Sequence, residues 1–221
     1  MRRLIIVAGL LALATGCRHL VEHSLNKVSG SGVYQTETRN VTGFNGLSLG
    51  GGFLVEIAIG KDEHVEVTSD DNLLSHIKTE VRNGVLHVST EGGDVSFARA
   101  PQLKITMPEL QSLEASGACQ VNVAQLRTEN LKVKLNGASK LTATGEIQTL
   151  TADLNGASRI NAKDLRAADV TVSANGASQA EVFASASLTA DANGASRISY
   201  FGKPGQVTPK KNGASSVTAA E

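Results

Sequence analysis

The chain has 221 residues, 21 lysines and arginines, 21 aspartates and glutamates, no tryptophan and an aromatic content of 3 %. Because its charges balance, it has no basic field to hold a nucleic acid or to reinforce membrane binding. The length suits one solenoid or sandwich domain with a small appendage.

Residues 1–16 have the pattern of a signal peptide. The positive start "MRR" precedes the apolar run "LIIVAGLLALA", which is too short to span a bilayer stably as a mature helix. The run ends in "TGC", so small residues stand immediately before Cys17. This arrangement resembles the lipobox of bacterial lipoproteins, although Ala14 stands where a large aliphatic residue is usual. Ordinary cleavage that leaves a free cysteine is the alternative.

Lipidation of Cys17 predicts an exported protein held to a membrane by its lipid. Each buried methylene contributes about 0.8 kcal/mol, so the several acyl chains expected on such a cysteine, palmitate among them, anchor firmly. Arg18 stands where an acidic inner-membrane retention signal would stand, which favours the outer membrane in a bacterium that has one. With Cys17 assigned to the lipid, Cys119 has no partner for a disulfide.

Residues 17–40 are predicted to be a tether. They lack sustained periodicity and contain "SGSG", a composition typical of flexible linkers. His19 and His23 lie four residues apart and could share a helix face as a metal pair. No further ligands with metal-site spacing lie nearby, so we interpret both as solvated tether residues.

Residues 41–115 are predicted to be a strand-rich N-terminal part. Apolar and polar residues alternate in "FLVEIAIG", "HVEVTS", "GVLHVST" and "QLKITM". Asn83 and Gly84 form a dipeptide typical of hairpin turns, and "DDNLLSHIKTEV" could form a short capped helix. The three glycines of "LSLGGGFLVEI" lack the Lys-Ser/Thr of a phosphate loop, which favours a tight strand entry.

A short phrase repeats across residues 116–219, which we predict to be β-helix repeats. It is written "LNGAS" or "ANGAS" in its central copies, and successive copies are 18 to 20 residues apart. The copies begin at Ser116, Asn136, Asn155, Asn175, Asn193 and Asn212. A fixed period of this kind is typical of solenoids and related arrays.

The residues before each phrase alternate with a period of two. Leu131, Val133 and Leu135 stand at apolar positions, and the places between such residues are Lys, Asp, Ser or Thr in every copy. This alternation predicts strands with one face inward and one outward. Pro209 and Lys211 occupy inward positions in the last copy, as expected of an irregular terminal rung.

These patterns predict an all-β fold, a right-handed single-stranded parallel β-helix with about 19 residues per rung. At about 3.3 Å per residue a rung has room for three short strands joined by corners, and rungs stack about 4.8 Å apart. The alternative is a meander in which every Asn-Gly turns a hairpin. The near identity of all four residues Asn-Gly-Ala-Ser favours the helix, because stacked corners constrain each of them.

We interpret the phrase as the corner of a rung. Stacked asparagine amides can form a hydrogen-bonded ladder, glycine supplies a positive φ, and Ala and Ser keep the corner thin. The predicted corner residues are Asn136, Gly137, Asn155, Gly156, Asn175, Gly176, Asn193, Gly194, Asn212 and Gly213.

The repeated "SGA" and "NGAS" phrases, the opening "GFNGLSLGGGFLVEIAIG" with "NGVLHVST", and the ending "NGASRISYFGKPGQV" together resemble a known family. It is the bacterial auto-transporter adhesin, head GIN domain family, and the likeness covers roughly residues 38–219. The resemblance implies a β-helical domain on an exported, often lipid-anchored protein. It implies no catalytic or binding residues.

Few residues suggest catalysis. Asp153 and Asp191 both stand two positions before a phrase, where a polysaccharide lyase or hydrolase could place an acidic groove. Ser173 lies between them and lysines flank the column, which favours a solvated face. The scarcity of Tyr and Trp also leaves little to stack against sugar rings.

Two further features have structural interpretations. A column four positions before the phrase could suit an ice or crystal surface, but β-branched residues also simply favour strands. It contains Thr151, Thr171, Thr189 and Thr208. Cys119 takes the place of the phrase serine, and no histidine lies beyond His87 to act as its base, so we interpret it as a small corner residue.

The sequence therefore predicts a lipid-anchored cell-envelope protein that acts as a non-catalytic interaction, adhesin-like or structural module. We expect no cofactor, no metal and no nucleic-acid partner. The expected partners are the membrane, through Cys17, and an envelope or extracellular protein or glycan. The alternative is a polysaccharide-active β-helix enzyme that uses an acidic groove.

Overall fold

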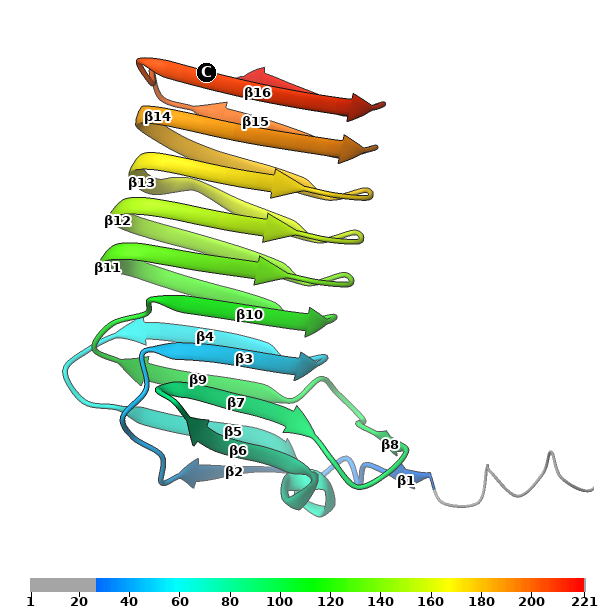
Figure 1. Ribbon diagram of the computed structural model, residues 1–221. Coiled ribbons are helices and arrows are strands. Elements are labelled where there is room, and N and C mark those ends of the chain that lie inside the picture. Colours follow the sequence, from blue (N-terminus) through cyan, green and yellow to red (C-terminus); the bar gives the residue numbers. More distant parts are fainter. Residues whose placement is uncertain (1–26, 221) are drawn as a thin grey trace, which may run out of the picture.

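The computed structural model describes residues 27–220, which are nearly all β (Figure 1). The predicted signal peptide, Cys17, His19 and His23 lie outside the described residues. The elements are β1 (Val28–Ser29), β2 (Tyr34–Arg39), β3 (Gly46–Gly51), β4 (Leu54–Ile59), β5 (His64–Asp70), the 3₁₀ helix η2 (Asp71–His76), β6 (Ile77–Arg82), β7 (Val85–Thr90), β8 (Val95–Ser96), β9 (Gln102–Met107), β10 (Ser112–Gly117), β11 (Gln120–Leu135), β12 (Lys140–Leu154), β13 (Arg159–Ala174), β14 (Gln179–Gly194), β15 (Arg197–Phe201), β16 (Gln206–Gly213) and β17 (Ser216–Ala219). Within residues 27–220, no helix is long and apolar enough to cross a membrane.

Strands β11 to β14 are stacked rungs of a parallel solenoid. Each is 15 or 16 residues long, and each pairs in parallel with the next rung along the chain. Figure 1 shows the rungs one above another, with their phrase corners at one edge. The β-helix prediction is confirmed. The meander alternative is wrong, because its hairpins would pair neighbouring repeats in antiparallel.

Strand β13 shows how one long strand surrounds the core. Its buried side chains form three groups: Ile160 with Ala162, Leu165 with Ala167, and Val170 with Val172 and Ala174. Their spacing is two within a group and three between groups, so the face that points inward changes twice along the strand. These two changes and the phrase corner divide the rung into three sides, as the sequence predicted.

The parallel stack continues below the first phrase into residues 41–115. Strands β10, β3 and β7 extend one side in parallel, and β4 and β9 extend another. Antiparallel strands close this end, since β6 pairs with β7, β5 with β9, and β2 with β5. The sheet therefore runs unbroken across residue 116, where the sequence placed the start of the repeats.

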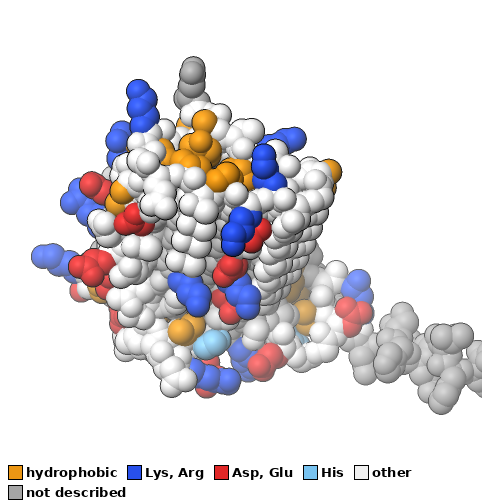
Figure 2. All heavy atoms as spheres, turned by 45° about the horizontal axis from the view of Figure 1, so that its top comes forward, with side chains coloured by type: hydrophobic (Ala, Val, Ile, Leu, Met, Phe, Trp, Pro, Cys, Tyr) orange, Lys and Arg blue, Asp and Glu red, His pale blue; other side chains and the backbone are white. Residues whose placement is uncertain are grey.

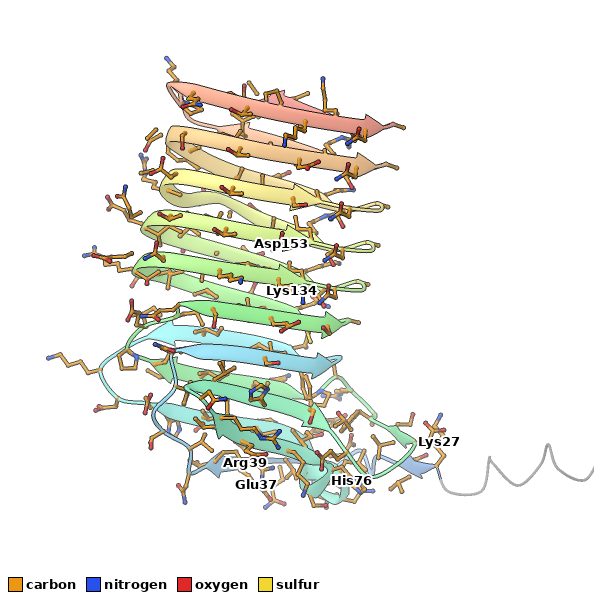
Figure 3. The ribbon with its side chains drawn as sticks, in the orientation of Figure 1. Lys27, Glu37, Arg39, His76, Lys134 and Asp153 are labelled. Atoms are coloured by element: carbon orange, nitrogen blue, oxygen red, sulfur yellow. The ribbon has the colours of Figure 1, made fainter. Side chains whose placement is uncertain are left out.

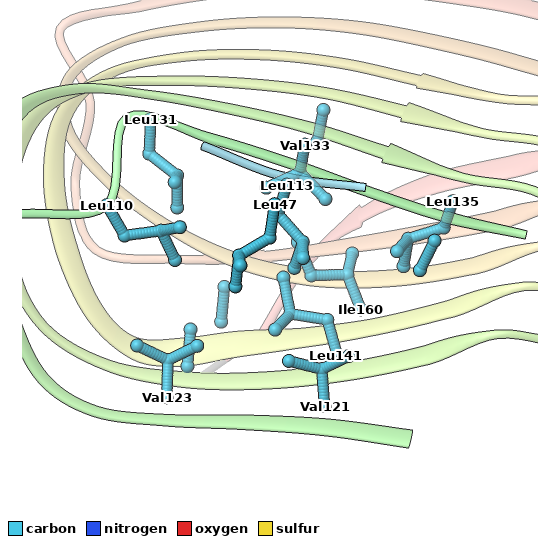
Figure 4. Packing of buried hydrophobic residues seen from close by; sticks show 14 of the residues in the cluster. Leu47, Leu110, Leu113, Val121, Val123, Leu131, Val133, Leu135, Leu141 and Ile160 are labelled. Carbon is cyan, nitrogen blue, oxygen red and sulfur yellow. The ribbon is translucent and has the colours of Figure 1, made fainter. Parts of the chain in front are cut away.

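One hydrophobic core runs along the stack. In Figure 4, Leu47, Leu113 and Val133 from one side face Val121 and Leu141 from another. The largest buried side chains lie in the N-terminal part and include Phe53 and Met107. On the side that precedes the phrase, β13 and β14 bury Ala174, Ala190 and Ala192 as well as valine and leucine. Small side chains at these inward positions suit a narrow, close-packed core.

The predicted tether needs correction at its C-terminal end. Tyr34–Arg39 form β2, which pairs antiparallel with β5, and Val28–Ser29 form β1, which pairs with β8. Strand β2 is an edge strand that buries no residue completely, so its sequence lacks the apolar alternation of an inner strand.

Of two local predictions in the N-terminal part, the hairpin is confirmed and the short helix is confirmed in part. Asn83 and Gly84, with φ of 52° and 75°, turn β6 into β7 as a hairpin. The predicted short helix over "DDNLLSHIKTEV" is only partly right. Its first half forms the 3₁₀ helix η2, which buries Leu73 and Leu74 but has no side-chain cap hydrogen bond, and its second half belongs to strand β6.

The C-terminal rung is irregular, as expected. Strand β16 pairs with β14, and its Val207, Pro209 and Lys211 stand in register with the buried Leu188, Ala190 and Ala192. Pro209 and Lys211 are nevertheless exposed. The core is thus covered incompletely at this end of the solenoid.

Candidate binding surfaces

The phrase asparagines form a ladder along one edge of the stack. Each side-chain amide nitrogen donates a hydrogen bond to the side chain one rung below. The Nδ2–Oδ1 distances are 3.1 Å from Asn155 to Asn136, 3.2 Å from Asn175 to Asn155, 3.0 Å from Asn193 to Asn175 and 2.8 Å from Asn212 to Asn193. At the bottom, Asn136 donates to Ser116 Oγ at 3.3 Å. These amides are therefore engaged within the stack.

The phrase glycines allow the corners to approach one another. Gly137, Gly156, Gly176, Gly194 and Gly213 have φ of 75°, 83°, 82°, 77° and 78°. A Cβ on Gly156 would lie 2.8 Å from the carbonyl oxygen of Gly137 below it. Both the positive φ and this contact require glycine.

The phrase serines also act within the stack. Ser158, Ser178 and Ser196 are buried, and each hydroxyl donates to the carbonyl oxygen of its own phrase asparagine, at 2.8, 2.9 and 2.8 Å. Because asparagine, glycine and serine are all committed to corner geometry, the phrase is structural rather than a repeated recognition motif.

Cys119 lies at the serine position of the first phrase and is fully buried. Its Sγ lies 3.5 Å from the carbonyl oxygen of Gly51, and burial raises the pKa of the thiol. A thiol that stays protonated is a poor nucleophile. The position fits a small corner residue.

The glycine run at residues 50–52 is the lowest corner of the same column. Gly51 has φ of 143°, and its carbonyl oxygen accepts a hydrogen bond from the Ala118 amide at 2.8 Å. The run lacks the Lys-Ser/Thr of a phosphate loop, and its sequence therefore predicted a tight strand entry. It also lacks the Asn and Ser of the phrase. The run also lies far from the repeats along the chain, so the spacing of the phrases does not predict that it forms a corner of the same column.

Asp153 and Asp191 lie on an outward column of one sheet, two rungs apart. The register runs from Lys134 to Asp153, Ser173, Asp191 and Lys210. Figure 3 shows Lys134 and Asp153 side by side on adjacent rungs of this face. Lys134 Nζ lies 3.3 Å from Glu114 Oε1, and Asn193 Nδ2 donates to Asp191 Oδ1 at 2.9 Å. The four hollows of about 200, 440, 500 and 870 Å³ in the described surface are lined by residues other than these two aspartates.

The predicted threonine column is also an outward file of the same sheet. Thr151, Thr171, Thr189 and Thr208 are neighbours in register on four successive rungs. Lys132 occupies the same file one rung lower, so the threonine face is short.

Three hollows in the described surface are large enough to hold a small ligand. One, of about 500 Å³, lies over the outward face of β9, β4, β11 and β12 and is lined by small side chains such as Ala58, Ala124 and Thr144. A second, of about 440 Å³, is lined mainly by polar side chains, Glu109 among them. The third, of about 870 Å³, lies where the upper rungs bend, and basic and aromatic side chains line it. Within residues 27–220 no group of three His, Cys, Asp or Glu side chains could hold a metal ion.

Comparison with known proteins identifies the family. Residues 43–204 match the family model described as "Putative auto-transporter adhesin, head GIN domain". The chain belongs to this family. The resemblance inferred from the repeated phrases is thereby confirmed. None of the curated proteins searched matches the chain.

Solved structures of three bacterial proteins share the fold of this head GIN domain. A putative adhesin from Bacteroides fragilis has a TM-score of 0.67 and 21 % identity, and the match covers 87 % of this chain and 100 % of that one. A putative lipid binding protein from Parabacteroides distasonis has a TM-score of 0.59 and 17 % identity, over 88 % of this chain and 100 % of that one. A putative adhesin from the same organism has a TM-score of 0.58 and 20 % identity, with the same coverage of both chains. At these identities the likeness shows the fold alone.

Proposed function

We propose that the chain is a non-catalytic, adhesin-like binding module of the bacterial cell envelope, anchored by a lipid on Cys17. The observation that carries the proposal is that the repeats contain two kinds of position, phrase residues that hold the stack together and outward residues that do not. The polar groups of the repeated phrases form hydrogen bonds within the stack, so the sheet faces and the bends carry the side chains that differ from rung to rung. The family description and the export pattern of residues 1–17 support the same role.

A rigid stack is well suited to binding without chemistry. Each rung is held to its neighbours by backbone hydrogen bonds along 15 or 16 residues, so the backbone positions of outward residues are fixed in columns. A backbone that is ordered before binding loses little conformational entropy when a partner is bound. Asp153 and Asp191, which the enzyme alternative would use, lie two rungs apart on an outward column that also carries Lys134 and Lys210.

The test is retention of bacteria on surfaces coated with envelope or matrix glycans and proteins. Deleting the gene is expected to reduce retention, and the wild-type chain is expected to restore it. Asp153→Asn combined with Asp191→Asn is expected to restore it equally, because these side chains are not catalytic. Cys17→Ser is expected to fail and to move the chain from the membrane fraction to the soluble fraction.

Three results would count against the proposal. Unchanged retention in the deletion strain would contradict the binding role. Membrane retention of Cys17→Ser would contradict the lipid anchor. If the purified chain cleaved a glycan and the double aspartate variant did not, the result would contradict the binding module and support the enzyme alternative.

A further inference from the structure

The hollow of about 870 Å³ lies where the upper rungs bend, near the C-terminal end of the solenoid. Its lining includes Lys163, Asp164, Arg166, Phe183, Phe201 and Lys203. Figure 2 shows hydrophobic side chains gathered at this end of the molecule, with lysines and arginines around them. The volume lies within the range of about 300–1,000 Å³ that is typical of small-ligand sites.

A local irregularity of β13 builds one wall of the hollow. Ala162 pairs with Val182 of β14, but the next residue, Phe183, pairs with Arg166. Residues 163–165 therefore have no partner in β14 and form a bulge. This bulge carries Lys163 and Asp164 outward, at the edge of the hollow.

Three successive rungs place a cation and two aromatic rings in one column. Arg166 pairs with Phe183, and Phe183 pairs with Phe201 on the rung above. The guanidinium carbon of Arg166 lies 5.4 Å from the centroid of the Phe183 ring, which is a cation–π contact. Both rings are partly exposed, although apolar side chains of this size are usually buried.

The charges of the hollow are unbalanced. Lys163, Arg166 and Lys203 contribute three cations against the single carboxylate of Asp164. None of the three cations forms an ion pair with another described residue. The single carboxylate of Asp164 cannot balance three cations, so an anion in the hollow would be stabilised by the excess positive charge.

We propose that this hollow binds an acidic saccharide, a short glycan that carries carboxylate, sulfate or phosphate groups. The Arg166 guanidinium presents a planar donor fork that suits such groups, and the lysines add positive charge on either side. The Phe183 and Phe201 rings offer apolar faces against which the C–H face of a sugar ring can pack. The site gives the proposed binding module a ligand class, and it therefore rests on that proposed function.

The test is calorimetric titration of the full chain, purified in detergent, with defined oligosaccharides. Oligogalacturonate supplies carboxylates, a heparin-derived oligosaccharide supplies sulfates, and a neutral maltooligosaccharide of equal length is the comparison. We expect at least one acidic probe to bind at least tenfold more tightly than the neutral one, and its binding to weaken as salt is raised. Comparison of the two acidic probes shows which acidic group the site prefers.

Matched variants locate the site. Arg166→Gln and Phe183→Leu are each expected to weaken binding of that probe at least tenfold. Arg159→Gln removes a cation from an exposed position of the same strand outside the hollow, and it is expected to leave binding unchanged. Thermal unfolding of each variant shows that the stack is intact.

Three outcomes overturn the inference. The first is that the wild-type chain binds neither acidic probe. The second is that the Arg166→Gln and Phe183→Leu variants both bind the probe as the wild type does. The third is that oligoglutamate binds more tightly than either acidic saccharide. In each case, the proposed function would still be supported if the wild-type strain were retained on the coated surface and the deletion strain were not. The two proposals therefore fail separately.

Discussion

At the scale of single residues, the corner phrase is explained by what lies one rung below it. The glycines combine a positive φ with contact to a carbonyl oxygen, the asparagine amides form a ladder, and the hydroxyls of Ser158, Ser178 and Ser196 donate to the backbone of their own corner. Three of the four identities of the phrase therefore have their own physical cause. A hairpin turn would constrain chiefly two positions.

Replacing a corner glycine should separate the cost of conformation from the cost of stacking. Gly156→Ala places a methyl group 2.8 Å from the Gly137 carbonyl oxygen at φ of 83°, whereas Gly43→Ala meets nothing within 4 Å at φ of 79°. We expect Gly43→Ala to lower the free energy of unfolding by about 1 kcal/mol and Gly156→Ala by about 2–4 kcal/mol. Urea denaturation of both variants measures the difference, and equal losses would show that stacking adds nothing.

The asparagine ladder predicts a graded effect of position. Asn175 donates to Asn155 and accepts from Asn193, while Asn212 at the top of the stack makes a single ladder bond. Asn175→Ala is therefore expected to cost about 2 kcal/mol of unfolding free energy and Asn212→Ala under about 1 kcal/mol. Urea denaturation again provides the measurement. A larger loss for Asn212→Ala would be inconsistent with a ladder.

At the scale of elements, prediction from sequence succeeded where each rung repeats the one before it. The inward positions of β11 to β14 could be read from Leu, Val and Ala at fixed distances before each phrase. Strand β2 could not, because an edge strand that buries no residue completely leaves no apolar alternation. The lowest corner escaped notice because Gly50, Gly51 and Gly52 share only glycine with the phrase.

The candidate site was beyond prediction from repeat spacing. Phe183 and Phe201 both stand eight residues after a phrase asparagine, which is a signal that the sequence does offer. Arg166 stands eleven residues after its own, and the bulge at 163–165 is what brings it into register with Phe183. When the repeats are aligned by their phrases, Arg166 therefore falls three positions away from Phe183 and Phe201. The low aromatic content also concealed that two of the chain's few rings meet at one bend.

The terminal strand β16 carries features that oppose pairing with another edge. Pro209 cannot donate a hydrogen bond, and stacking a second copy above Lys211 would bury its charge without a partner. We expect Pro209→Val combined with Lys211→Val to increase self-association severalfold in light scattering over a concentration series. Lys210→Val changes the neighbouring outward position and is the control, expected to behave as the wild type. If self-association of the double variant did not increase, Pro209 and Lys211 would not be what prevents pairing at this edge.

At the scale of the whole molecule, the solenoid converts a one-dimensional repeat into surfaces of different use. Corners hold the stack together, sheet faces present columns of mixed charge, and the bend near the C-terminal end gathers cations and aromatic rings. Each rung contacts mainly its neighbours, so stability accumulates along the stack. Substitutions on a sheet face can therefore change recognition without disturbing the architecture.

The central claim is that all copies of the phrase lie in one column. The most direct measurement is the distance between two spin labels, attached at Ala118→Cys and Ala214→Cys in a chain that also carries Cys17→Ser. Pulsed electron–electron double resonance measures this distance. Both positions are exposed, and the buried Cys119 is shielded from labelling. Five rungs separate these corners, so stacking at about 4.8 Å per rung predicts a separation of roughly 24 Å between the backbones. A separation of about 50 Å, as expected if the phrases lay at opposite tips of antiparallel hairpins, would contradict the account.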